Sequence, residues 1–189
     1  MFCEDSRGTD IDHFWPLKPF SRRTFVWENL LLACGGCNRV KGNRFDLNDQ
    51  GDPLLIDPTA EDPWNFLFFE PDTGIIVARV DPATGTEDPK GEHTTDPAVL
   101  PLNIDPATDG RRRIARSLRR AVHRFLERAE TESAQALDDL LVELLDHDDY
   151  GLLEWYFLRD GQNDPPFSDL RMKHSIAWGQ ITKTVGRDS

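Results

Sequence analysis

The clearest periodic pattern of apolar positions lies in the second half of the chain. Between residues 111 and about 129, apolar side chains recur every three or four positions, as on one face of a helix. The same spacing predicts a second helix from 131 to about 147, with Thr131 or Ser133 as its N-cap. The positions expected to face inward are Ile114, Leu118, Val122, Phe125 and Leu126 in the first helix, and Ala134, Leu137, Leu140, Leu141, Leu144 and Leu145 in the second.

Turn-forming residues dominate the middle of the chain. Segment 46–110 is rich in Asp, Pro and Gly, which favour turns and loops. Residues 65–69 and 75–80 are short strand candidates separated by EPDTG, as in a hairpin. We expect the rest of this segment to be irregular. Near the C-terminus, the aromatic-rich segments 151–158 and 169–181 predict one or two further short helices.

These patterns predict an α+β protein in three parts. Residues 1–48 would form a compact module built around chemically active side chains, and 49–108 a loop-rich connecting layer with a possible β-hairpin. Residues 109–189 would form a helical domain. No apolar run approaches the roughly 20 residues that span a bilayer, and the first residues, MFCEDSRG, lack the regions of a signal peptide. We therefore expect a cytoplasmic protein with no membrane contact.

The charge of the chain is unevenly distributed. A net charge of −12 argues against a protein that coats nucleic acid by itself, because phosphate binding depends on Lys and Arg. Segment 111–128, however, carries eight arginines and one glutamate. These arginines can follow a DNA backbone, or they can dock on the protein's own acidic segments or on an acidic partner. Both interpretations stay open.

Three cysteines, Cys3, Cys34 and Cys37, predict a structural zinc site. They cannot all pair as disulfides, and Cys34 and Cys37 have the spacing of a zinc knuckle with Gly35 and Gly36 in its turn. A fourth ligand is not evident. A C-x-x-C pair ending at Cys3 would place the fourth ligand just before Met1. Otherwise the metal takes water or a more distant ligand such as His93, or the site is vestigial. Redox chemistry and ordinary buried thiols are the alternatives.

Residues 11–44 also contain the parts of a site for phosphodiester hydrolysis. Asp12 offers an anionic oxygen ligand, and His13 beside it has the side chain best suited to take a proton from water near neutral pH. Asn38 offers a second oxygen ligand for a hard cation. Next to it, a short basic segment can neutralise phosphate charge through Arg39, Lys41 and Arg44.

The ordered set of Asp-His, Asn and C-x-x-C-N resembles the HNH endonuclease superfamily, with its ββα-metal fold. The resemblance implies that Asp12 and Asn38 bind a catalytic Mg²⁺ or Mn²⁺ and that His13 is the general base. Asn29 is similar to the middle asparagine of the motif, which braces the loop holding that histidine. Asn38 stands where many members have histidine, which makes this an HNN version. The cysteines resemble the structural cysteine pairs of some members.

A narrower resemblance extends over residues 1–128. The segments DIDHFWP, WENLLLACGGCNRVKGNRF and TDPAVLPLN, followed by the arginine-rich helix, are similar to HNH proteins of bacterial antiphage systems. The family that they resemble most is the nuclease subunit of Septu, also found with some retrons. That resemblance implies DNA as substrate, an ATPase partner and a hetero-oligomer.

Other interpretations of the same residues stay open. The module can be a non-catalytic zinc adaptor that docks on a partner protein or nucleic acid, and the substrate can be RNA, because the site reads a phosphodiester and not a sugar. We expect the bulky residues near the motif to be core rather than base-stacking residues, since a small fold needs apolar anchors; they are Phe14, Trp15, Phe25, Val26 and Trp27. The remaining histidines are expected to be surface or structural; they are His93, His123, His147 and His174.

Overall fold

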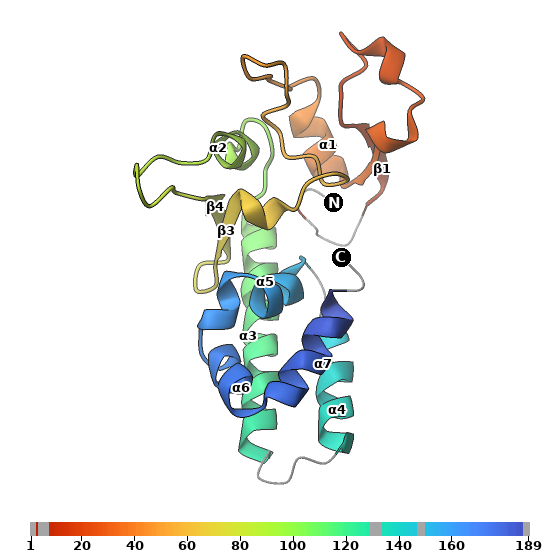
Figure 1. Ribbon diagram of the computed structural model, residues 1–189. Helices are drawn as coiled ribbons and strands as arrows, with labels where there is room; N and C mark the ends of the chain where they lie inside the picture. The colour runs from red at the N-terminus through yellow and green to blue at the C-terminus, as the bar shows by residue number, and fades with distance from the viewer. Residues whose placement is uncertain (1–2, 4–7, 129–133, 147–149, 187–189) are drawn as a thin grey trace. The chain divides into compact units, whose positions relative to one another are not determined.

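The computed structural model describes residues 3, 8–128, 134–146 and 150–186 (Figure 1). The chain divides into two compact units, Met1–Gly110 and Arg111–Ser189. The first unit contains two small antiparallel sheets and short helices, and the described part of the second is helical. The predicted α+β class is therefore confirmed, with its helical part at the C-terminal end. No helix of the described residues is long and apolar enough to cross a membrane.

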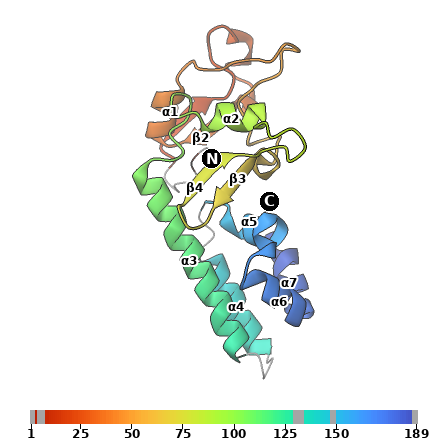
Figure 2. The ribbon, with the colours of Figure 1, turned by 90° about the vertical axis from the view of Figure 1, so that its left-hand side faces the viewer.

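The first unit begins with a ββα arrangement, as the motif region predicts. Strand β1 (Asp10–His13) pairs antiparallel with β2 (Leu30–Ala33), and the chain then enters helix α1 (Gly35–Lys41) (Figure 2). A long loop between the strands contains two short 3₁₀ turns, η1 (Ser21–Arg23) and η2 (Trp27–Asn29). Together, the two strands and α1 bring the ends of the motif region side by side.

The connecting layer is more regular than expected. The predicted hairpin is confirmed as β3 (Leu67–Glu70) paired with β4 (Ile75–Ala78), after the short turn η3 (Pro63–Asn65). Helix α2 (Pro89–Thr95), which packs on β4, was not predicted. Its sequence signal is Asp88 before Pro89: the aspartate side chain accepts hydrogen bonds from the Lys90 and Gly91 amides and caps the helix.

Gly91 explains how closely α2 approaches the hairpin. A Cβ at this position would lie 2.4 Å from the Phe66 carbonyl oxygen and 3.0 Å from Ala78, so only glycine fits. The main apolar cluster of this unit combines the motif region with the connecting layer. Its buried members are Cys3, Phe14, Leu31, Cys37, Leu55, Val99, Leu100 and Leu102. The core of the motif region therefore includes residues on both sides of position 48. The predicted boundaries between the three parts of the chain stay predictions.

The second unit consists of amphipathic helices. Helix α3 (Asp105–Arg128) starts within the first unit, six residues before the predicted start, because Pro106 is tolerated in a first helical turn. It is followed by α4 (Ala134–Leu145), α5 (Leu152–Leu158), η5 (Asp160–Asn163), α6 (Phe167–Lys173) and α7 (Ser175–Val185). The predicted N-caps Thr131 and Ser133 lie outside the described residues, as do His147 and the side chain of Ala134.

The predicted inward faces of α3 and α4 are largely confirmed. Leu118, Val122 and Phe125 are buried in α3, and Leu140 and Leu144 in α4. Four further positions are half-buried: Ile114, Leu126, Leu137 and Leu141. The prediction for Leu145 was wrong: it is the last residue of α4 and is exposed, because the helix has no further turn to cover it.

Several arginines of α3 are buried or contact other side chains of the protein. Arg111 is fully buried, Arg124 forms an ion pair with Glu143 of α4, and the Arg119 guanidinium lies 5.9 Å from the ring centroid of Tyr156. These contacts favour internal pairing for part of the arginine-rich helix.

Candidate active site and cysteine metal centre

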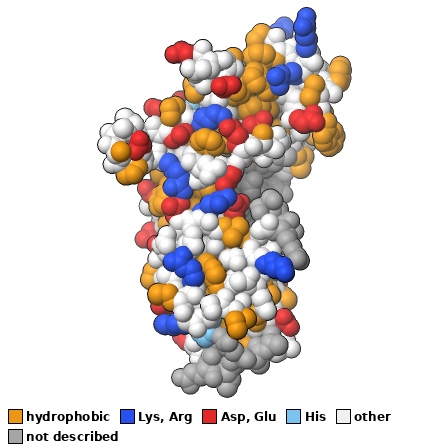
Figure 3. Space-filling view, in the orientation of Figure 1, with side chains coloured by type: hydrophobic (Ala, Val, Ile, Leu, Met, Phe, Trp, Pro, Cys, Tyr) orange, Lys and Arg blue, Asp and Glu red, His pale blue; other side chains and the backbone are white. Residues whose placement is uncertain are grey.

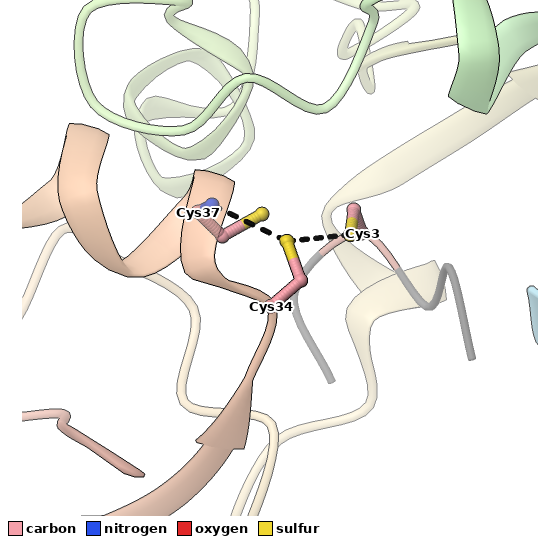
Figure 4. Close-up of side chains that lie close together, drawn as sticks. All are labelled: Cys3, Cys34 and Cys37. Carbon is pink, nitrogen blue, oxygen red and sulfur yellow. Dashed lines mark hydrogen bonds between the residues drawn. The ribbon is translucent and has the colours of Figure 1, made fainter. Parts of the chain in front are cut away.

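Three cysteine side chains meet at the start of α1 (Figure 4). Their sulfur atoms all lie within 4.8 Å of one another, and Sγ of Cys3 is 3.6 Å from Sγ of Cys34. Cys34 is the N-cap of α1 and accepts a hydrogen bond from the Cys37 amide at 3.3 Å. Four thiolates about 2.3 Å from a tetrahedral zinc ion would be about 3.8 Å apart. The group can therefore hold a metal ion such as zinc.

The Cys37 thiol would have to lose its proton to bind a metal ion. Hydrogen bonding to Cys3 and burial raise the pKa of the Cys37 thiol far above its usual range. A cation binds thiolates, so it must displace these protons, and metal affinity is expected to rise with pH. Among the described residues, no further His, Cys, Asp or Glu joins the group. His93, considered as a fourth ligand, has its Nδ1 3.8 Å from Asp46 instead.

His13, the predicted general base, has a defined tautomer. Its Nε2 lies 3.0 Å from the carbonyl oxygen of Thr24, in the loop between β1 and β2. A carbonyl oxygen only accepts hydrogen bonds, so Nε2 must carry a proton. In the neutral imidazole, Nδ1 is then the basic nitrogen. The side chain is half-buried, which leaves it accessible at the end of its strand.

Asn29 fastens the same loop. It is buried, and its Oδ1 accepts from the Trp15 amide at 2.7 Å. Its Nδ2 donates to the carbonyl oxygens of Trp15 at 3.1 Å and Arg23 at 3.0 Å. Arg23 directly precedes Thr24, so Asn29 holds the segment whose carbonyl contacts His13. This geometry matches the bracing role expected of the middle asparagine, and the role itself stays a prediction.

Asp12 and Lys41 form a buried ion pair. The Lys41 Nζ lies 3.0 Å from Oδ2 of Asp12 and donates hydrogen bonds to Oδ1 at 3.3 Å and to the His13 carbonyl at 2.7 Å. Oδ2, although closer, accepts no hydrogen bond from the described residues. Burial raises the pKa of the Asp12 carboxyl and lowers the pKa of the Lys41 ammonium, against their mutual attraction.

The Asp12–Lys41 ion pair explains the unusual burial pattern of strand β1. The apolar Ile11 is exposed and Asp12 is only 5% exposed, the reverse of an ordinary half-buried strand. Lys41, predicted to contact phosphate, is thus placed inside the protein, whereas Arg39 and Arg44 are exposed.

Asn38, the second predicted cation ligand, contacts an acidic residue that was not predicted. Its Nδ2 donates to Oδ2 of Asp10 at 3.2 Å. Asp10 lies two residues before Asp12 on β1, so both side chains leave the strand on the same side, toward α1. The structure therefore pairs Asp12 with Lys41 and Asn38 with Asp10. The period of two along β1 was the sequence signal for Asp10.

The prediction of core positions near the motif was half right. Phe14 is buried and Trp15 is half-buried, in ring contact with Phe20 and Phe45. The prediction was wrong for the bulky residues of the loop, since Phe25 is 94% exposed, Trp27 is 81% exposed and Val26 is exposed. Residues distant in sequence fill the core of this unit, so the loop is free to turn these three side chains outward.

Comparison with known proteins finds a relative from bacteria. The chain is similar to the Septu protein PtuB of Bacillus thuringiensis. The two are 29% identical over 128 residues, which is 67% of this chain and 44% of that protein. The chain thus spans less than half the length of this relative. No family model and no solved structure matches the chain.

Proposed function

We propose that this chain is a divalent-metal-dependent HNH endonuclease that hydrolyses DNA phosphodiester bonds in bacterial antiphage defence. The biological setting is supported by the similarity to the Septu protein PtuB. The chemistry is supported above all by one observation, the contact of His13 Nε2 with the Thr24 carbonyl oxygen. This contact orients the imidazole and leaves Nδ1 to act as the base.

The reaction is a direct attack of water on phosphorus. His13 accepts the proton of the attacking water at Nδ1 while the bond from phosphorus to the 3′ oxygen breaks. The departing 3′ oxygen takes a proton from solvent water, so the products are a 5′-phosphate and a 3′-hydroxyl, and no covalent enzyme intermediate forms. Asn29 keeps the loop, and with it the imidazole, in one orientation through its hydrogen bonds to Trp15 and Arg23.

Asp12 and Asn38, joined by Asp10, would hold the catalytic Mg²⁺ or Mn²⁺. Their carboxylate and amide oxygens are donors that such hard cations prefer. The Asp12 Oδ2 is buried and lies 3.0 Å from the Lys41 ammonium, so a cation bound at this oxygen would compete with that ion pair. When bound, the cation supplies Lewis-acid stabilisation of a non-bridging phosphate oxygen and of the departing 3′ oxygen.

The exposed arginines of α1 and the residues after it would bind the substrate backbone. Arg39 lies one position after Asn38, and Arg44 follows the end of the helix at Gly42. Contacts of this kind place a phosphate without reading sequence. The cysteine group would hold a structural Zn²⁺ that fixes the N-terminus of α1, and Asn38 lies in the first turn of that helix.

A plasmid-cleavage assay tests this function. The purified chain is incubated with DNA and Mg²⁺ or Mn²⁺, alone and with the proposed ATPase partner, because a net charge of −12 predicts weak DNA binding by the isolated chain. We expect cleavage that His13→Ala reduces by about 10²-fold or more. His123→Ala, at an exposed position of α3, is the matched control and should cleave normally. Cleavage by His13→Ala at the wild-type rate would remove His13 from the mechanism.

The second candidate is a non-catalytic zinc adaptor. It predicts stable binding to the ATPase with no cleavage of DNA or RNA under any metal condition, and no effect of His13→Ala on that binding. RNA in place of DNA as the cleaved polymer would keep the same site and chemistry, so both polymers belong in the assay.

A further inference from the structure

Two large aromatic side chains protrude from the loop beside His13. Phe25 is 94% and Trp27 is 81% exposed, the highest values among the large apolar side chains of the described residues. Figure 3 shows hydrophobic and basic side chains together on this end of the first unit. Burying an aromatic side chain is strongly favourable, so such exposure at two neighbouring positions indicates an interaction site.

Phe25 and Trp27 are exposed although the same loop has an aromatic cluster against which its side chains can pack. The same loop contributes Phe20 to a cluster of rings with Trp15 and Phe45, whose centroids lie 4.7 to 5.7 Å apart. Its backbone is also hydrogen-bonded, since the Val26 amide donates to the Arg23 carbonyl and the Asn29 amide donates to the Val26 carbonyl. The loop therefore packs Phe20 against the aromatic cluster and directs Phe25 and Trp27 outward.

The protruding rings belong to the same loop that contacts the candidate base, His13. The Thr24 carbonyl that contacts His13 belongs to the peptide group that links Thr24 to Phe25. Asn29, which anchors this segment through Arg23, is the last residue of η2, and Trp27 is the first. A partner seated on Phe25 and Trp27 thus contacts the loop that holds the His13 imidazole through its Nε2.

The charge around the rings favours nucleic acid as this partner. Within an acidic chain, segment 17–28 has three exposed basic side chains, Lys18, Arg22 and Arg23, and one exposed acidic side chain, Glu28. Cationic groups beside exposed aromatic rings are the combination that binds phosphates and stacks on bases. In an intact duplex, neighbouring bases cover each base face, so the rings need an unpaired or opened step.

We infer that Phe25 and Trp27 stack on unpaired bases of the DNA substrate next to the cleaved phosphate and select single-stranded or distorted DNA. This role rests on the proposed function, because it assigns the substrate of that same site. We call the two residues the aromatic wedge. It binds the bases while Arg39 and Arg44 contact the backbone.

Binding measured without cleavage tests the wedge. In the His13→Ala background, the affinity of the full chain is measured by anisotropy for a fluorescent single-stranded oligonucleotide and for its duplex, with the proposed ATPase partner present. Since base stacking contributes about 1–3 kcal/mol per base, Phe25→Ala and Trp27→Leu should each weaken single-strand binding about 5- to 150-fold. Duplex affinity should change less than about 3-fold. Ile176→Ala, at an exposed apolar position of α7, is the matched control and should change neither.

Trp27 also provides a direct signal, because stacking on a base quenches indole fluorescence. Quenching by the oligonucleotide should shrink in Trp27→Phe and persist in Trp178→Phe, at a half-buried position of α7. Wild-type single-strand affinity in both wedge variants, loss of ATPase binding in place of DNA binding, or absence of any DNA binding would each overturn the inference. Wedge-dependent binding by a chain that never cleaves would instead refute the nuclease function alone, whereas unchanged binding by an active nuclease would refute the wedge alone.

Discussion

The ammonium nitrogen of Lys41 lies 3.0 Å from Oδ2 of Asp12, and both side chains are buried. The residues come from α1 and β1, 29 positions apart, and Lys41 also donates to the His13 carbonyl. The pair thus fastens the strand that carries the candidate base to the helix that carries Asn38. Burial disfavours both charges, as the raised pKa of Asp12 and the lowered pKa of Lys41 indicate. Ion pairs of this kind contribute little net stability.

This arrangement predicts a non-additive stability cycle. Lys41→Met should lower the free energy of unfolding by about 3–5 kcal/mol, because it leaves a buried carboxylate unpaired. Adding Asp12→Val should restore most of that loss, since two apolar side chains then replace the pair. Urea denaturation of the two single variants and the double variant measures the cycle. Additive losses in the double variant would show that the two residues stabilise the fold independently of each other, against this prediction.

Metal removal should destabilise the first unit. A structural metal contributes folding free energy directly, so a chelator should lower the melting temperature of the wild-type protein. Cys37→Ser should reduce zinc content and melting temperature in the same way, and chelator should have little further effect on that variant. Ser21→Ala, at an exposed position, is the control. Full zinc content and unchanged melting in Cys37→Ser would identify the three thiols as ordinary packing residues.

Asn29→Ala should affect both stability and catalysis. The substitution leaves the Trp15 and Arg23 backbone groups without their partner, which costs about 1–3 kcal/mol for each buried group left unsatisfied. Loosening the loop should also lower kcat more than it raises KM, because His13 loses its orientation while the backbone contacts of the substrate remain. Steady-state cleavage kinetics, run below the melting transition, separate these two effects.

A second asparagine provides the comparison for that measurement. Asn43→Ala alters an exposed side chain between Arg39 and Arg44 and should change neither kcat nor stability. An Asn29→Ala variant that loses stability yet keeps its kcat would restrict Asn29 to a structural role.

Local patterns were sufficient for much of the fold. Helical periodicity identified α3 and α4, and two short apolar runs around EPDTG identified the β3–β4 hairpin, because these elements depend on residues close in sequence. The C-x-x-C spacing likewise brought Cys34 and Cys37 together within one turn. Helix α2 was missed because its segment is short and resembles a loop in composition, and only the capping by Asp88 marks its start.

The partners of the site residues required the tertiary structure. The sequence placed Asp12, His13, Asn29 and Asn38 in one short region, and by itself it determined the helical unit, the hairpin and the grouping of metal-binding residue types. It could not determine that Lys41 turns inward to Asp12, that Asp10 meets Asn38, or that Phe25 and Trp27 remain exposed. Whether a side chain is buried depends on which distant segments cover it, and here residues 55–102 complete the core of the motif region. Only folding decides that coverage, and with it which charges and rings face the substrate.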